Sequence, residues 1–156
     1  MPTFDDVHAL AQVMPGRWTV KATNLPAWLT GERRDALLEF EVTGQNPLAL
    51  SSVLSFTDPD GKAKATRTRD RWNGSGFTRG GVLSRIRWEV AGARQGLLVL
   101  RYEKSLATEA GVDVVVAEGI DATELRSVIA AAPASFGLTL EEFASLTWLD
   151  HLPPIE

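Results

Sequence analysis

The chain has 156 residues, of which 44% are hydrophobic and 23% are charged, so it can bury the core of one domain. Its formal net charge of −4 gives no broad attraction to phosphate backbones and argues against nucleic acid as a general partner. Cysteine is absent, which excludes disulfides, thiolate metal ligands and a cysteine nucleophile.

The first predicted element is a short helix over residues 4–14. Thr3 can cap its start, and Val7, Leu10 and Met14 recur at the spacing of one helix face. A Pro-Gly pair follows directly, so the helix is predicted to end there.

Residues 17–118 are predicted to form a β-meander, because the hydrophobic period changes there from that of a helix to that of a strand. Turn sequences such as Asp-Pro-Asp-Gly and Asn-Gly-Ser-Gly separate the strands. No helical segment lies between neighbouring strands, which excludes a parallel βαβ sheet. Consecutive hairpins favour an up-and-down antiparallel β-barrel over a sandwich. The predicted strands lie at residues 17–22, 38–42, 48–56, 62–72, 77–79, 82–90, 97–104 and 112–117, with a long apolar loop at 24–33.

Two helices are predicted within residues 121–149. The sequences Asp-Ala-Thr-Glu at 121–124 and Thr-Leu-Glu-Glu at 139–142 have the character of capping boxes. Leu140 and Phe143 belong to the predicted inward stripe of the second helix. These residues are too few for an independent core, so we expect both helices to pack on the outside or one mouth of the barrel, within a single domain over residues 1–156.

The tripeptide Gly16-Arg17-Trp18 begins the first strand just after a short helix, and it resembles the Gly-x-Trp signature of lipocalins and their calycin relatives. The resemblance covers residues 4–118 and implies a calycin-like barrel. It also implies that Trp18 plugs the closed end of the barrel, with Arg101 as the arginine that covers this plug.

Three further segments resemble those of uncharacterised, lipocalin-like bacterial proteins: Asp70-Arg71-Trp72, Phe77-Thr78-Arg79-Gly80 and Lys104-Ser105-Leu106. This likeness implies a fold without a function. The chain departs from secreted lipocalins, since it lacks their disulfide and has two C-terminal helical segments in place of one long helix and a short strand. The Gly-x-Trp-x-Gly-x-Gly pattern of nitrobindin-like haem barrels fails at Val20 and Ala22.

Candidate ligand contacts are aromatic and cationic side chains that the alternation directs into the barrel or to its mouth. Trp28 lies in the apolar loop and is predicted to cover the mouth or to form an oligomer contact. Trp72 and Trp88 flank the Gly-rich bend and are predicted to face one cavity, although packing is the alternative role for each aromatic ring. The predicted ligand-binding residues are Trp28, Phe40, Phe56, Trp72, Arg79, Trp88, Tyr102 and Lys104.

Two cationic side chains are predicted near the mouth. If Tyr102 points into the barrel, Lys104 lies on the same side, and its ammonium can meet an anionic ligand group. An exposed lysine at a strand end is the alternative. Arg79 is the preferred functional arginine.

A row of arginines also marks one face of the predicted strand at 62–72. Arg67, Arg69 and Arg71 alternate along it and could bind phosphate or carboxylate groups. The alternative is a solvated exterior that protects the barrel against aggregation.

Catalysis has little support in the sequence. The two histidines, His8 and His151, have no metal-ligand spacing and no obvious nucleophile to activate. His151 as an axial haem ligand is a further alternative to a surface histidine. We therefore expect neither a metal nor a cofactor.

The leading functional hypothesis is non-catalytic binding of a small, partly apolar and anionic molecule in the barrel lumen. The alternatives are a structural or oligomerising barrel filled by its own side chains, with a homodimer as its form, and a haem-binding or enzymatic barrel. The N-terminus carries no secretory signal and no segment reads as a membrane span, so we expect a cytoplasmic protein with no membrane or nucleic-acid partner.

Overall fold

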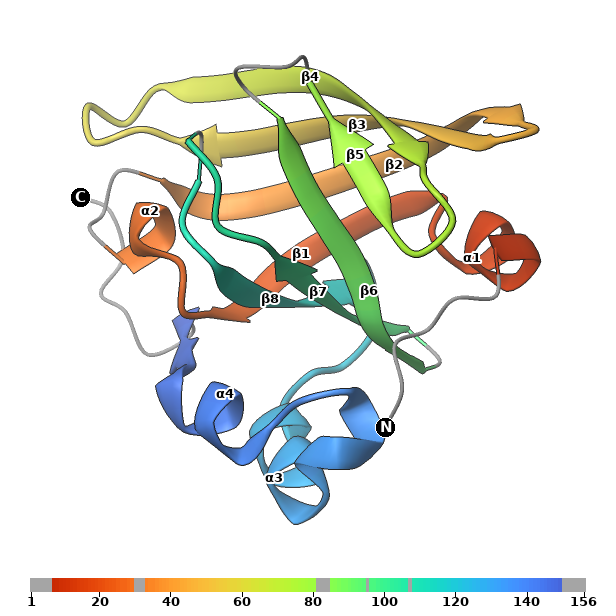
Figure 1. Ribbon diagram of the computed structural model, residues 1–156. Helices are drawn as coiled ribbons and strands as arrows, with labels where there is room; N and C mark the ends of the chain where they lie inside the picture. Colours follow the sequence, from red (N-terminus) through yellow and green to blue (C-terminus); the bar gives the residue numbers. More distant parts are fainter. Residues whose placement is uncertain (1–6, 30–32, 81–84, 95, 107, 150–156) are drawn as a thin grey trace.

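The computed structural model describes residues 7–29, 33–80, 85–94, 96–106 and 108–149 (Figure 1). Within this part of the chain, eight antiparallel strands pair in sequence order, and the barrel closes because β1 pairs with both β8 and β2. The predicted up-and-down antiparallel β-barrel is confirmed. The strands are β1 (Gly16–Thr23), β2 (Arg34–Gln45), β3 (Leu48–Thr57), β4 (Ala63–Trp72), β5 (Phe77–Arg79), β6 (Ile86–Arg94), β7 (Leu97–Tyr102) and β8 (Gly111–Ala117).

Some strand boundaries differ from the prediction. The strand predicted at 82–90 is β6, which begins at Ile86, and residues 81–84 lie outside the described part of the chain. The strand predicted to end at residue 104 is β7, which ends at Tyr102. The alternation of inward and outward side chains therefore stops two residues earlier than the sequence suggested.

Helices mark the two ends of the barrel (Figure 1). At one end, α1 (Val7–Val13) packs Leu10 into the barrel core, as the predicted N-terminal helix requires. At the other end, α2 (Pro26–Leu29) is a short helix within the predicted apolar loop. Among the described residues, no helix has the length and apolar character needed to cross a membrane.

Alternating side chains separate an inner core from an outer one. In β7, Leu98 and Leu100 belong to the core inside the barrel, whereas Leu97 and Val99 belong to the core on its outer face. This two-residue period is the one expected of a strand buried on both sides.

The C-terminal segment covers the outer face of the barrel wall (Figure 1). It contains α3 (Leu125–Ala131), a short 3-10 helix η1 (Pro133–Phe136) and α4 (Leu140–Ser145). The two predicted C-terminal helices are thus confirmed. The second ends earlier than predicted, because the chain continues into a short strand, β9 (Thr147–Trp148), which pairs with β1.

The predicted inward position of Leu140 is wrong. It was expected to point inward, but its side chain is 76% exposed. It is the first residue of α4, directly after the Thr139 cap, so it lies before the helix turns its apolar face to the barrel.

Two glycines allow the C-terminal segment to approach β6 closely. A Cβ atom at Gly92 would clash with the Phe136 carbonyl oxygen, and one at Gly137 would clash with the Ala91 carbonyl oxygen. Gly137 also has a positive φ of 75°, which disfavours other residues. Backbone contact at this point fixes η1 against the barrel wall.

Candidate functional site

A cavity of about 500 Å³ opens at the α2 end of the barrel. Its lining comes from α2 and the segments on either side of it, from each of the strands β2 to β8, and from the loop between β7 and β8. The apolar part of its wall is formed by Leu25, Trp28, Leu38, Leu54 and Ile86.

The other half of the barrel is filled by side chains. Phe77 stacks on Trp88 with 4.6 Å between ring centroids, and Phe40 also stacks on Trp88, with 6.1 Å between ring centroids. All three residues are at most 3% exposed. Stacked aromatic rings of this kind pack a core closely and leave little room for a ligand.

Asp70 anchors a polar network below the cavity. Arg79 donates to its carboxylate from Nε at 2.7 Å and from Nη2 at 3.2 Å, and the Ser52 hydroxyl donates at 2.7 Å. The Trp88 indole donates to the same carboxylate at 3.3 Å. Burial alone would lower the pKa of Arg79, but the hydrogen bonds and charge of Asp70 outweigh it and raise that pKa. Arg79 therefore reaches the cavity with its charge already balanced.

Asp113 brings a second carboxyl group to the cavity wall. It is 2% exposed and faces the lumen from β8. The Thr23 hydroxyl donates to its Oδ1 at 2.7 Å, and the Trp28 side chain also hydrogen-bonds it. Burial raises the pKa of Asp113 to about 7, although these hydrogen bonds and the charge of Arg33 act to lower it.

Tyr102 faces the same lumen from the end of β7. Burial raises the pKa of its phenol, and the Asp113 charge acts in the same direction. Its hydroxyl therefore stays protonated at neutral pH and can serve as a hydrogen-bond donor or acceptor.

Arg33 places a positive charge at the mouth of the cavity. Its guanidinium lies 5.3 Å from the ring centroid of Trp28 and 5.2 Å from that of Phe56. Contact with two aromatic rings holds the guanidinium in place through cation–π attraction.

Trp18 lies at the α1 end of the barrel. It is 4% exposed, and its indole donates a hydrogen bond to the Met14 carbonyl at 2.8 Å. The tryptophan of the Gly-x-Trp motif thus packs against the residue that follows α1.

Arg101 lies on the outer face of β7, which corrects its predicted place over Trp18. It donates to both carboxylate oxygens of Glu142 at 2.8 and 2.7 Å, to Glu89 at 2.8 Å and to the Gly137 carbonyl at 2.6 Å. These bonds raise the pKa of Arg101 and lower that of Glu142. The alternation explains the correction, since Arg101 adjoins the inward-facing Tyr102 and must point outward.

Three of the predicted ligand-binding residues line the cavity, and two lie in the filled half of the barrel. The lining residues are Trp28, Arg79 and Tyr102. Phe40 and Trp88 point inward as the alternation requires, but they lie too far from the mouth and pack against other side chains.

The remaining three predicted residues also lie outside the cavity wall. Phe56 is at the rim, beneath the guanidinium of Arg33. Trp72 packs edge-on against Phe77 at 5.3 Å. The Lys104 side chain is 73% exposed, because β7 ends before it and no longer directs it inward.

Two charged residues of the site were missed at the level of sequence. The sequence could have indicated Asp113, because it is the one acid in the apolar sequence Val-Asp-Val-Val-Val. It lies two residues before the inward-facing Val115 and so points to the same side of the strand. No feature of the sequence indicated Arg33, because this residue lies in the loop before β2, where side chains follow no regular alternation.

Comparison with solved structures identifies the fold as that of the lipocalins within the calycins. The siderocalin Ex-FABP, described as having dual ligand specificities, superposes with a TM-score of 0.59 at 13% identity over 87% of this chain and 93% of its own. The bovine lipocalin allergen Bos d 2 gives a TM-score of 0.58 at 16% identity over 90% and 97% of the two chains. The amine-binding protein of Rhodnius prolixus, in its tryptamine complex, gives 0.61 at 13% identity over 96% and 82%.

Comparison at the level of sequence adds no relative. No family model matches the chain, and no curated protein matches it either. The similarity to lipocalins therefore concerns the fold.

Proposed function

We propose that this protein binds a small, partly apolar molecule in the open half of its barrel, without bond chemistry. The observation that carries the proposal is the cavity of about 500 Å³, a volume within the usual range of small-molecule sites. Apolar side chains form much of its wall, while Tyr102 and Asp113 supply polar groups. The dual ligand specificities of the siderocalin and the tryptamine bound by the Rhodnius protein support a ligand in this barrel too.

The ligand is proposed to carry an anionic group directed toward Arg33. Arg79 is neutralised by Asp70, and Lys104 points into solvent, so neither offers a net positive charge to the lumen. Arg33 is held at the mouth by two aromatic rings. The apolar part of the ligand would then lie against Leu38 and Leu54.

Asp113 makes the affinity depend on pH. Its pKa of about 7 means that it loses its negative charge as the pH falls through neutrality. An anionic ligand should bind more tightly below pH 7, because protonated Asp113 no longer repels it and can donate a hydrogen bond. A cationic ligand should show the opposite trend.

The burial of Trp28 argues against the alternative of an oligomerising barrel. Its side chain is 5% exposed and lines the cavity, so it presents little surface to a second subunit. Side chains fill only the half of the barrel that contains Phe40 and Trp88, which leaves the α2 half for a ligand.

Titration of the intrinsic tryptophan fluorescence tests the proposal, since Trp28 lies in the cavity wall. Decanoate, decanol and decylamine form a matched series with one apolar body and three different charges. We expect a saturable change with decanoate that strengthens from pH 8 to pH 6, and a weaker response to decylamine. Calorimetry of Trp28→Phe should still detect binding where the fluorescence change is lost.

Two results would count against the proposal. A flat response to the whole series, extended to aromatic acids and tetrapyrroles, would reject binding in the lumen. Tighter binding of decylamine than of decanoate at pH 8 would reject the anionic ligand while retaining the cavity.

A further inference from the structure

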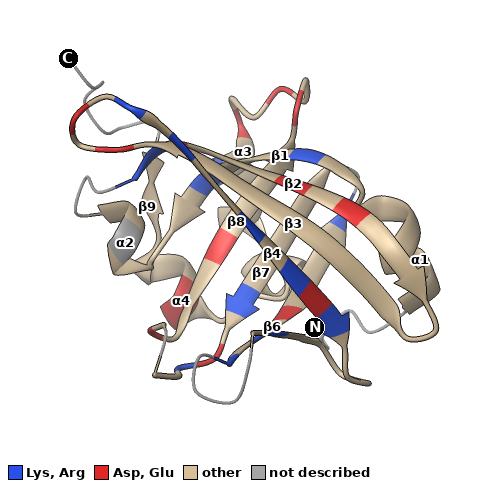
Figure 2. Cartoon of the chain, turned by 90° about the horizontal axis from the view of Figure 1, so that it is seen from above, with Lys and Arg blue, Asp and Glu red and all other residues tan. Residues whose placement is uncertain are grey.

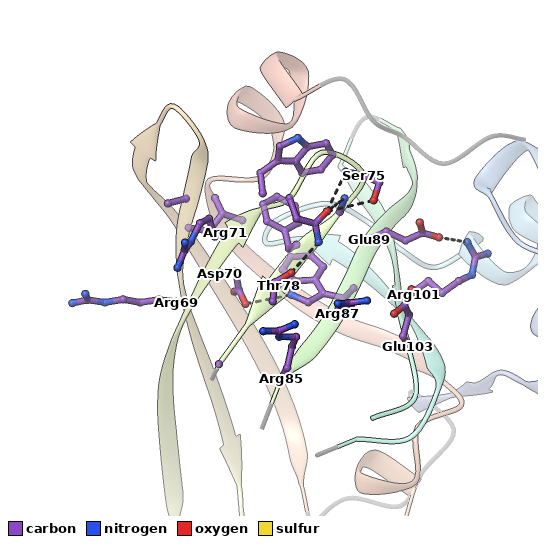
Figure 3. A pocket seen from close by; sticks show the side chains of 18 of the residues that line it. Arg69, Asp70, Arg71, Ser75, Thr78, Arg85, Arg87, Glu89, Arg101 and Glu103 are labelled. Atoms are coloured by element: carbon purple, nitrogen blue, oxygen red, sulfur yellow. Dashed lines mark hydrogen bonds and ion pairs between the residues drawn. The ribbon is translucent and has the colours of Figure 1, made fainter. Parts of the chain in front are cut away.

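A second, separate hollow lies on the outer face of the barrel, around the short strand β5. Its volume is about 960 Å³, and four exposed arginines line it (Figure 3). Arg69 and Arg71 come from β4, Arg87 comes from β6, and Arg85 directly precedes β6. We call the hollow lined by these four arginines the arginine hollow.

Strand pairing brings these arginines together. Arg71 is paired with Thr78 of β5, and Thr78 is paired with Arg87 of β6, so the three residues form one row across the sheet. Arg69 and Arg85 lie two residues away from this row along their chains, on the same face. Figure 3 shows the two pairs on either side of Thr78.

Small residues form the floor between the two pairs. β5 turns its large side chains Phe77 and Arg79 into the barrel and presents Thr78 outward. The next outward position is Gly80, which has no side chain. The long arginine side chains on both sides therefore extend farther from the sheet than the small residues of β5 between them, and this difference in length forms the hollow.

The arginine hollow has an excess of positive charge. In the described part of the chain, no carboxylate lies within ion-pair distance of any of the four arginines. The lining also contains three acids: Glu89 is engaged by Arg101, the buried Asp70 is engaged by Arg79, and Glu103 lies at the edge near Arg101. With Arg101 the lining holds five arginines against these three acids, so positive charge remains in excess. Like charges on neighbouring strands repel one another, and a bound anion would relieve that repulsion.

The spacing of the arginines defines the size of the anion. Residues two apart on one strand are separated by about 7 Å, and two strand spacings amount to about 10 Å. Guanidiniums bind phosphate oxygens through paired N–H donors, so four of them at these distances suit two or more phosphate groups on one compact frame.

A long polyanion fits the surface less well. The formal net charge of −4 would be −8 without these four arginines, so the surroundings of the arginine hollow repel a chain of phosphates that extends beyond it. Figure 2 shows that basic residues gather on β4, whose acidic residue is the buried Asp70, while the other acidic residues are distributed over other elements. We propose that the arginine hollow binds a compact oligophosphate, either free in solution or as a lipid headgroup.

Calorimetry with inositol hexakisphosphate as the probe tests this site in roughly physiological salt. We expect Arg71→Gln and Arg87→Gln each to weaken binding about ten-fold or more, because each removes charge-assisted hydrogen bonds. Arg126→Gln on α3 is the matched control, since Arg126 is an exposed arginine far from the hollow in sequence, and it should leave the affinity unchanged. Circular dichroism of each variant confirms that the fold is retained.

Vesicles distinguish the two sources of phosphate. Binding to phosphatidylcholine vesicles that contain a bisphosphorylated inositol lipid, with the same loss in Arg71→Gln, would support the site and identify a headgroup. Binding of the free probe without vesicle binding would support a soluble oligophosphate. The proposal is overturned if the probe does not bind, if Arg126→Gln weakens it as much as Arg71→Gln does, or if a single-stranded oligonucleotide binds more tightly through the same arginines.

Discussion

Replacement of Asp113 by asparagine should change how the stability of the protein depends on pH. The buried carboxyl has a pKa of about 7 in the folded protein, against 3.8 for an ordinary aspartate. Below pH 4 the carboxyl is protonated in both the folded and the unfolded chain and has no effect. As the pH rises from 4 to 7, the unfolded chain loses the proton while the folded one keeps it, so the wild-type protein loses stability.

The magnitude follows from the difference in pKa. About three pKa units at 1.36 kcal/mol each correspond to a loss on the order of 4 kcal/mol between pH 4 and pH 8. Asparagine has a similar shape, and its amide oxygen can still accept the hydrogen bond from Thr23. Asp113→Asn should therefore lack this loss and become more stable than the wild type above pH 7.

Urea unfolding at pH 5, 6, 7 and 8, followed by tryptophan fluorescence, measures the difference between the two proteins. Taking the difference removes the effect of every other titrating group. A gap that widens in favour of the variant up to about pH 7 and then stays constant is expected. A difference that does not depend on pH would refute the burial and the raised pKa of Asp113.

Three further substitutions test the packing around the barrel. Trp18→Phe removes the buried hydrogen bond to the Met14 carbonyl and should lower the free energy of unfolding by about 1–3 kcal/mol, measured by urea unfolding. Gly92→Ala places a Cβ against the Phe136 carbonyl and should cost about 1–3 kcal/mol, with faster amide exchange in η1 and α4; unchanged exchange would contradict the close approach. Arg101→Met removes the hydrogen bonds to α4 and β6 and should destabilise the protein by about 1–3 kcal/mol, an effect that differential scanning calorimetry can compare with that of Arg126→Met.

The barrel was predictable because its strands obey a strict alternation. Trp18 and Val20 point inward on β1, and Leu98 and Leu100 do so on β7, as the period of two requires. Turn sequences marked the ends of most strands, and the connections showed no helical pattern long enough for a βαβ crossover, which left little choice of topology; the helix found there, α2, spans only four residues. These are local signals, and short stretches of sequence carry them.

The position of the cavity was harder to predict, because alternation gives the side of a strand but not the height along the barrel. Phe40 and Leu54 both point inward, yet Phe40 is packed in the filled half and Leu54 lines the cavity. Which level a residue occupies depends on the stagger between strands. That register is set by pairings between residues far apart in the chain.

The arginine hollow illustrates the same limit. The row containing Arg69 and Arg71 was visible in the sequence, but its proximity to Arg87 depends on the pairing of both strands with β5. Arg101 is the opposite case, because the inward position of Tyr102 already implied an outward arginine.

Filling the cavity tests the central claim most directly. Leu54→Trp adds a large side chain to the cavity wall, whereas Val128→Trp makes a matched change at an exposed position on α3. In calorimetric titrations with decanoate at pH 6, we expect Val128→Trp to bind as the wild type does and Leu54→Trp to lose binding while it stays folded. Equal affinity in all three proteins would contradict a ligand site inside the barrel.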